Sequence, residues 1–183
     1  MAAADNLVWV DLEMTGLDPE RCTIVEIATI ITDSDLGLVA EGPNLVIHQP
    51  TAVLDQMNPE VVALHKRSGL LDQIPASNIS LQQAEATTVA FVTEHCKPGR
   101  TLLCGNSVWK DRQFIERYMP KLAGFFHYRM IDVSSIKELV RRWYAGEPSF
   151  PKKKETHRAL DDIRESIDEL RWYRQHVFVE REG

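Results

Sequence analysis

Two carboxylates stand inside the apolar segment WVDLEMTGLD, residues 9–18. The alternation of apolar residues around them predicts a buried β-strand, and alternate side chains of a strand share one face. Asp11 and Glu13 are therefore expected to point the same way, although the strand could also end early and leave both acids in a solvated loop. Two buried carboxylates repel each other, and a divalent cation removes that cost. Oxygen ligands of this kind suit Mg²⁺ or Mn²⁺.

A third acid, Asp111, lies in the segment GNSVWKDRQFIERYM. Helical spacing places it on the same face as Phe114 and Ile115, while Arg112 and Glu116 are expected to face water. The inward face of this helix would thus begin with a carboxylate. The competing interpretation is a first-turn acid that the helix dipole favours.

The segment THRALDDIRESIDEL offers two further acids. At about 100° per residue, Asp162 borders the apolar stripe of the expected helix on the side of Ala159 and Ser166, and Asp161 points nearly opposite. Asp162 is therefore the acid expected to reach a buried site. The small residues beside it would let the helix approach a sheet closely.

His157 precedes this helix and follows the stretch AGEPSFPKKKET, residues 145–156, which is typical of an exposed loop. A histidine at the start of the helix could turn toward the same acids. An imidazole titrates near pH ~6.5, so it can accept a proton from water at neutral pH. Taken alone, the simpler interpretation is a surface histidine at a helix start.

The elements that must position these side chains are strands first and helices later. Strands are expected at residues 7–13, 24–33, 43–49, 101–106 and 129–135, and helices near 61–69, 80–96, 111–119, 136–144 and 157–176. Close spacing of the first three strands favours antiparallel pairing. The later alternation of strand and helix favours parallel pairing. The expected fold is of the α/β class, a mixed sheet covered by helices.

Composition limits the classes of function. The chain has 183 residues, which fits a single domain, residues 1–183. With 44% hydrophobic and 26% charged residues it has the profile of a soluble globular protein. A net charge of -6 argues against binding long nucleic acid through a general basic face. It leaves room for a short anionic ligand, particularly one held through metal ions.

The cysteines and the apolar runs bear on location. Cys22, Cys96 and Cys104 match no zinc spacing and are interpreted as reduced thiols of a cytosolic protein. No apolar run approaches the ~20 residues that span a bilayer, and the start MAAADNL lacks the pattern of a secretory signal. We expect a cytoplasmic protein with no membrane partner.

Together these motifs resemble the histidine-type branch of the four-acid (DEDD) 3′→5′ exonucleases and, within it, the oligoribonucleases. The resemblance extends from about residue 7 to residue 175 and is carried in order by WVDLEMTGLDPER, EIATIITD, CGNS, HYR, IDVSSIKELVRRW and HRALDDIRESIDEL. It implies a ribonuclease H-like three-layer fold, with a mixed five-stranded sheet flanked by helices. It also implies hydrolysis of very short RNA, dinucleotides above all, from the 3′ end to 5′-mononucleotides.

The same resemblance implies roles for particular residues. Two Mg²⁺ or Mn²⁺ ions would be held by Asp11, Glu13, Asp111 and Asp162, with His157 as the general base.

For the substrate, the resemblance implies that Leu17 inserts between two bases and that Tyr128 caps a base from the neighbouring subunit of a homodimer. The terminal phosphate would be surrounded by His65, Ser107, Arg129 and Ser134. An arginine suits this place because its fork donates two hydrogen bonds.

The chain departs from the family pattern at two positions. Glu60 stands where a tryptophan is common, which bears on the preference for dinucleotides, and Met130 follows the arginine where a polar or aromatic residue is usual. Two other classes compete with the ribonuclease. A histidine-type exonuclease on DNA ends is disfavoured by HYR and DVSSIKELVRRW. A non-catalytic nucleotide-binding module is disfavoured because a binder has no need for a repulsive cluster of acids.

Overall fold

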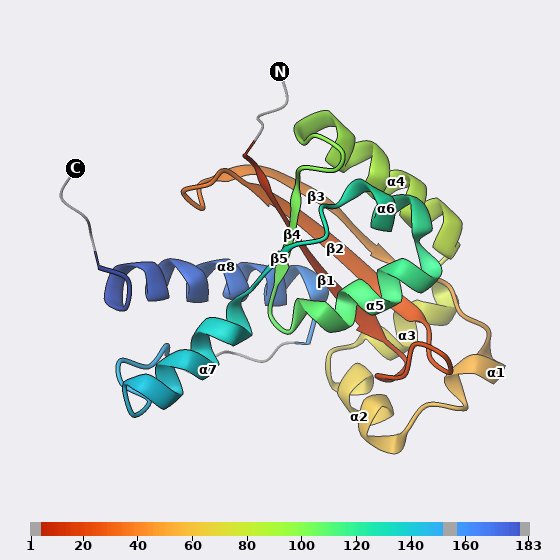
Figure 1. Ribbon diagram of the computed structural model, residues 1–183. Helices are drawn as coiled ribbons and strands as arrows, with labels where there is room; N and C mark the ends of the chain where they lie inside the picture. Colours follow the sequence, from red (N-terminus) through yellow and green to blue (C-terminus); the bar gives the residue numbers. More distant parts are fainter. Residues whose placement is uncertain (1–4, 152–156, 180–183) are drawn as a thin grey trace.

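The computed structural model describes residues 5–151 and 157–179. At its centre is a five-stranded sheet in the order β3-β2-β1-β4-β5 (Figure 1). The strands are β1 Leu7–Met14, β2 Ile24–Thr32, β3 Leu38–Val46, β4 Leu102–Gly105 and β5 Met130–Asp132. The first three strands pair antiparallel, whereas β4 runs parallel to β1 and β5 parallel to β4. The predicted mixed sheet and its pairing directions are confirmed.

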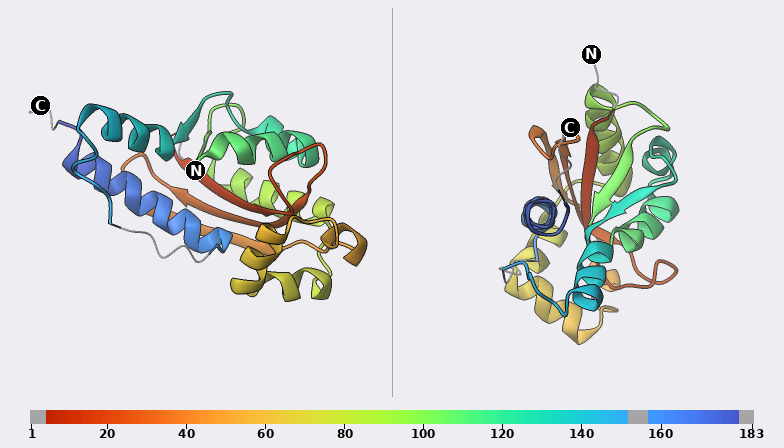
Figure 2. Two further views of the ribbon diagram at one scale, coloured as in Figure 1. Left: turned by 90° about the horizontal axis from the view of Figure 1, so that it is seen from below. Right: turned by 60° about the vertical axis from the view of Figure 1, so that its left-hand side comes forward.

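Helices cover both faces of this sheet, as the two views of Figure 2 show. They are α1 Thr51–Leu54, α2 Pro59–Arg67, α3 Leu70–Ala76, α4 Leu81–His95, α5 Val108–Tyr118, α6 Pro120–Phe125, α7 Val133–Trp143 and α8 Ala159–His176. Buried side chains of α4, α5 and α6 form one core with the sheet, and those of α7 and α8 form a second core on the other face. Among the described residues, no helix is both long enough and apolar enough to cross a membrane.

The alternation predicted for β1 decides which side chains face which helices. Val8, Val10 and Leu12 belong to the core beneath α4, α5 and α6. Trp9 belongs to the core beneath α8, and its Nε1 donates a hydrogen bond to Thr32 Oγ1 at 3.0 Å. Because side chains two residues apart share a face, the acids that follow Trp9 on β1 are directed toward α8.

Helix ends follow the predicted local chemistry in two places. Ser80 and Gln83 form the capping box of α4, since the backbone N–H of each is bound by the side chain of the other at 2.9 and 3.2 Å. After α2 the chain turns at Gly69 with φ 73°, a left-handed conformation that glycine adopts without strain. The short helices α1, α3 and α6 were not predicted from the sequence.

Three predictions about boundaries and faces were wrong. Strand β3 begins at Leu38 rather than at residue 43, because the exposed residues before 43 continue the ladder with β2. Strand β5 ends at Asp132, because the Asp132 side chain accepts a hydrogen bond from the backbone of Ser134 at 3.0 Å and starts α7 there. Arg112 is half-buried rather than exposed, because its Nη1 donates to the carbonyl oxygen of His127 at 2.9 Å.

The predicted loop at residues 145–156 is only partly described. Residues 145–151 lack helix and strand, with Phe150 packed edge-on against Trp172 at a ring separation of 6.0 Å. Residues 152–156, which include the three lysines, lie outside the described part of the chain.

Candidate active site

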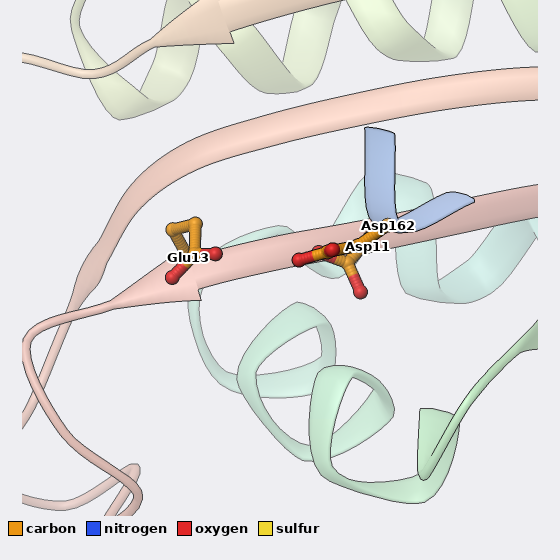
Figure 3. A group of neighbouring side chains, drawn as sticks. All are labelled: Asp11, Glu13 and Asp162. Atoms are coloured by element: carbon orange, nitrogen blue, oxygen red, sulfur yellow. The ribbon is translucent and has the colours of Figure 1, made fainter. Parts of the chain in front are cut away.

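Three carboxylates meet between the sheet and α8. Asp11, Glu13 and Asp162 each place one oxygen within 4.8 Å of the others (Figure 3). The first two come from β1 and the third from the first turn of α8, so distant parts of the chain converge here. Asp161 is not part of this group, since its half-exposed side chain pairs with Arg164 at 3.2 Å.

The three carboxylates repel one another, so a positive charge between them would be stabilising. Burial raises the pKa of Asp11 well above its ordinary range, and the charges of Asp111 and Asp162 raise it further. Burial also raises the pKa of Glu13 to about 8, with added repulsion from Asp162 and Glu26. A cation between the oxygens would stabilise the charged carboxylates, so this all-oxygen donor set fits a hard divalent ion.

Asp111 approaches the group from the other face of the sheet. It is buried in the first turn of α5, and its Oδ1 accepts a hydrogen bond from the backbone N–H of Leu12 at 3.0 Å. Burial raises the pKa of Asp111 to about 7 despite this bond. The structure thus brings three of the four predicted acids into one group and leaves Asp111 beside it, close enough to act on Asp11 through its charge.

Glu26 fixes the start of α8, a role that the sequence analysis did not identify. It is fully buried on β2, and its carboxylate accepts hydrogen bonds from Arg158 Nη2 at 2.7 Å and from the backbone N–H of Ala159 at 3.2 Å. His157 and Asp162 flank these two residues, so the bonds determine where both lie. A glutamate inside the apolar run IVEIATIIT was the available signal.

His157 lies directly before α8, where the sequence placed it. It is half-buried and has a left-handed backbone with φ 52°. Its charge is among the smaller causes that lower the pKa of His65.

His65 lies on α2 and reaches the acids from a third direction. Its Nε2 is 2.8 Å from the carbonyl oxygen of Met14 and donates to it, while Nδ1 lies 3.8 Å from Glu13 Oε2. Burial lowers the pKa of His65, which favours the neutral ring. The Nδ1 atom is buried without a hydrogen-bond partner among the described residues, which leaves a free acceptor at the edge of the acid group.

Ser107 and Ser134 meet where α5 and α7 begin. Ser134 Oγ accepts a hydrogen bond from the Ser107 backbone at 2.8 Å, and the two hydroxyl oxygens are 3.1 Å apart. Asp132 Oδ1 accepts from both backbone N–H groups, at 2.9 and 3.0 Å. Two helix starts therefore converge on one place, where the Asp132 carboxylate already accepts from both backbone N–H groups and a further anion would meet the serine hydroxyls.

The remaining predicted substrate residues lie at the surface. Leu17 is 71% exposed and Tyr128 is 70% exposed, both unusual for side chains of their size. The guanidinium of Arg129 lies over the Tyr128 ring, 5.2 Å from its centre. Of the two departures from the family, Glu60 is exposed in the first turn of α2, and Met130 packs against the core beneath α4.

Solved structures share the fold. An exonuclease I from Methylocaldum szegediense superimposes with a TM-score of 0.72 at 17% sequence identity, over 94% of this chain and 41% of that one. This chain therefore spans less than half the length of exonuclease I. The likeness confirms the ribonuclease H-like fold that the motifs implied.

Comparison with known sequences identifies the family of the chain as well as its fold. The exonuclease family model RNase_T matches residues 8–170. The oligoribonuclease of Marinobacter nauticus is 53% identical over 97% of this chain and 99% of its own length. The mitochondrial oligoribonuclease of Homo sapiens is 52% identical over 97% of this chain and 76% of its own. A match of this extent makes the chain a nuclease, and it belongs to the oligoribonuclease family of exonucleases.

Proposed function

We propose that this protein is a 3′→5′ exoribonuclease that hydrolyses very short RNA, dinucleotides above all, to 5′-mononucleotides. The observation that carries the proposal is the convergence of Asp11, Glu13 and Asp162 on one point. Family membership supports the same reaction class. The neighbouring hydroxyls of Ser107 and Ser134 supply a separate polar place that suits the terminal phosphate of a short substrate.

The acids are proposed to hold two divalent cations, Mg²⁺ or Mn²⁺, with Asp111 joining the group of three. Ions bound in such a site activate the attacking water and stabilise the leaving 3′ oxygen. The contribution of the chain is rigid placement. Asp11 and Glu13 are fixed by the pairing of β1 with β2, and Asp162 by the Glu26 bonds at the start of α8.

His157 is proposed to take the proton from the attacking water. Its place at the start of α8 leaves the imidazole half exposed, so water can reach it. An imidazole accepts protons near neutral pH, which matches this task. The buried His65 is a poorer candidate, because burial lowers its pKa and so disfavours the protonated ring that a base becomes.

The substrate is proposed to lie between the acids and the helix starts. The exposed Leu17 would separate the two bases. The terminal phosphate would contact Ser107, Arg129 and Ser134, and it would also contact His65 once Nδ1 of that ring takes up a proton and becomes a donor. A few such local contacts are compatible with a net charge of -6, because a dinucleotide needs no extended basic face.

We also propose a cytoplasmic location. Cys22, Cys96 and Cys104 are free thiols. Thiols stay reduced in that compartment.

Cleavage of a length series tests the proposed function. With Mg²⁺ or Mn²⁺ present, dinucleotides should be cleaved at least about 100-fold faster than long RNA, because only a dinucleotide places both of its ends correctly. The measurement is the initial rate on 5′-labelled RNAs and matched DNAs. Equal rates at all lengths would contradict the length preference. Faster cleavage of DNA would favour a DNA exonuclease, and binding without hydrolysis would favour a nucleotide-binding module.

A homodimer in which Tyr128 completes the neighbouring site can be tested by complementation. Tyr128 is 70% exposed, so it is available to a second copy. The Tyr128→Ala variant should lose about 10- to 100-fold in activity, the size of one lost stacking contact. Mixing it with the inactive Asp162→Ala variant should restore activity, because the second variant lends its tyrosine to the intact acids of the first. A mixture no more active than its components would show that Tyr128 acts within its own subunit.

A further inference from the structure

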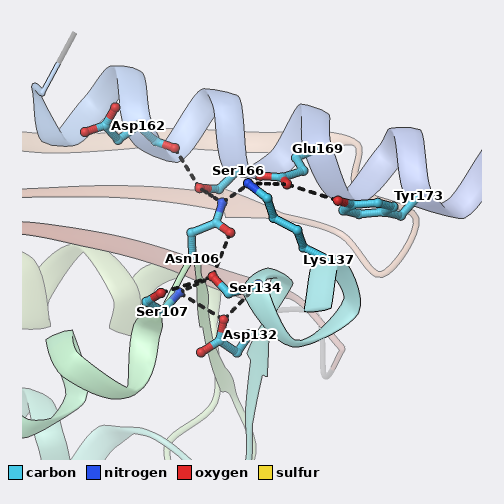
Figure 4. Close-up of polar contacts among 9 residues, drawn as sticks. All are labelled: Asn106, Ser107, Asp132, Ser134, Lys137, Asp162, Ser166, Glu169 and Tyr173. Atoms are coloured by element: carbon cyan, nitrogen blue, oxygen red, sulfur yellow. Dashed lines mark hydrogen bonds and ion pairs between the residues drawn. The ribbon is translucent and has the colours of Figure 1, made fainter. Parts of the chain in front are cut away.

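Asn106 connects α8 with the start of α7 (Figure 4). Its Nδ2 donates hydrogen bonds to Ser166 Oγ at 2.8 Å and to Glu169 Oε2 at 3.1 Å, both on α8. Its Oδ1 accepts a hydrogen bond from Ser134 Oγ at 3.1 Å. The amide thus uses both donor hydrogens on one helix and its oxygen on the other.

The two ends of this connection are the two ends of the proposed substrate site. Ser166 Oγ donates to the carbonyl oxygen of Asp162 at 2.7 Å, one helical turn away. At the other end, Ser134 contacts both the backbone and the hydroxyl of Ser107. A continuous set of hydrogen bonds therefore runs from the backbone carbonyl of Asp162 in the candidate metal site to the serine pair proposed to contact the phosphate.

The orientation of the amide is determined by its partners. Glu169 is fully buried, and its carboxylate also contacts Tyr173 Oη at 3.3 Å and Lys137 Nζ at 3.9 Å. An ionised carboxylate accepts hydrogen bonds and has no hydrogen to donate. The donor side of the Asn106 amide, Nδ2, therefore faces Glu169. The amide oxygen is then left for Ser134, and an aspartate at position 106 would set two carboxylates against each other.

We propose that Asn106 is a positioning residue, which fixes the distance between the acid group and the serine pair and thereby selects the length of the RNA. The proposal rests on the proposed function. A dinucleotide must engage both ends at once, and joining two binding contacts at a fixed spacing makes the second one intramolecular. An error of about 1 Å in such a spacing can cost about 100-fold in rate. A longer RNA, whose terminal phosphate lies beyond the serines, gains nothing from the spacing.

The test compares Asn106→Ala and Ser166→Ala with Tyr173→Phe. Asn106→Ala removes the whole connection, and Ser166→Ala removes the bonds that lead to Asp162 while the bond to Glu169 remains. Tyr173→Phe removes a different hydrogen bond to Glu169 and leaves every bond of Asn106 in place. The ratio of kcat/KM on a 5′-phosphorylated dinucleotide to that on a pentanucleotide should fall about tenfold or more in the first two variants. It should stay unchanged in Tyr173→Phe.

Two binding measurements, made without hydrolysis, distinguish a lost spacing from damage to the acid group or to the serine pair. Calorimetric titration with Mn²⁺ in the absence of RNA should give the wild-type affinity in Asn106→Ala, because all four acids are intact. Binding of the dinucleotide in Ca²⁺, with hydrolysis monitored, should weaken about tenfold, because the ligand must span both ends.

A wild-type length ratio in folded Asn106→Ala would overturn the proposal. An equal loss of rate on all lengths would overturn it too, since a smaller folded fraction lowers every rate alike. If Asn106→Ala does not fold, Ser166→Ala decides, because an alanine there keeps the close packing of α8 on the sheet. The length series of the wild-type protein is measured first. If the wild type has no length preference, the proposed function is contradicted, whatever the variants do.

Discussion

Replacing Asp162 with alanine should lower the rate of dinucleotide cleavage by at least about 100- to 1,000-fold, the loss typical of removing one group that stabilises developing charge. The substitution removes one of the three converging oxygens at the start of α8. The fold should remain intact. Without metal the variant should unfold at higher urea than the wild type, because repulsion from Asp162 is among the causes that raise the pKa of Glu13. Initial rates at saturating Mn²⁺ and urea titration in chelator measure the two effects.

Asp161→Ala is the matched control. It removes the same carboxylate from the same helical turn, but Asp161 pairs with Arg164 at the surface. An exposed ion pair of this kind contributes little to stability, so rates should stay within about twofold of wild type. Equal losses in both variants would contradict the assignment of Asp162 to the site.

The positions of the acids could be predicted from the sequence, because the periodicity of apolar residues indicates which face of a strand or helix is buried. The two-residue period of β1 placed Asp11 and Glu13 with Trp9, and the structure shows that face turned toward α8. The 3.6-residue period of α8 separated Asp162 from Asp161. In both cases the prediction required only the geometry of one element.

The bonds between elements were not accessible, because periodicity does not say what a buried face meets. Glu26 and Arg158 are 132 positions apart in the sequence, and Asn106 and Ser166 are 60 apart. No local pattern links such pairs. The end of β5 was missed for a related reason. Asp132 accepts a hydrogen bond from Ser134 and starts a helix inside a run that reads as a strand.

The stability of the metal-free protein should fall as the pH rises from about 4 to about 8. Glu13 and Asp111 have pKa values of about 8 and about 7 in the folded protein, against ordinary values of 4.5 and 3.8. A carboxyl group whose pKa is raised by folding holds its proton more tightly when folded. Its favourable contribution is complete below the ordinary pKa and is lost as the pH rises through the folded pKa. The expected loss is on the order of a few kcal/mol, because the groups interact and do not add.

Divalent metal should reverse this loss where the carboxylates are ionised. At pH 8, Mn²⁺ at about 100 times its Kd should raise the free energy of unfolding by about 2.7 kcal/mol, or the melting temperature by about 5 to 10 °C. At pH 5 the effect should be much smaller, because protons compete for the same oxygens. Melting curves in chelator and in Mn²⁺ across this range measure it, and Asp162→Ala should reduce both the pH dependence and the metal effect. Equal stabilisation by Mn²⁺ at pH 5 and pH 8 would show that the ion binds elsewhere. Metal binding depends on pH in this range only when the ligands lose their protons in this range.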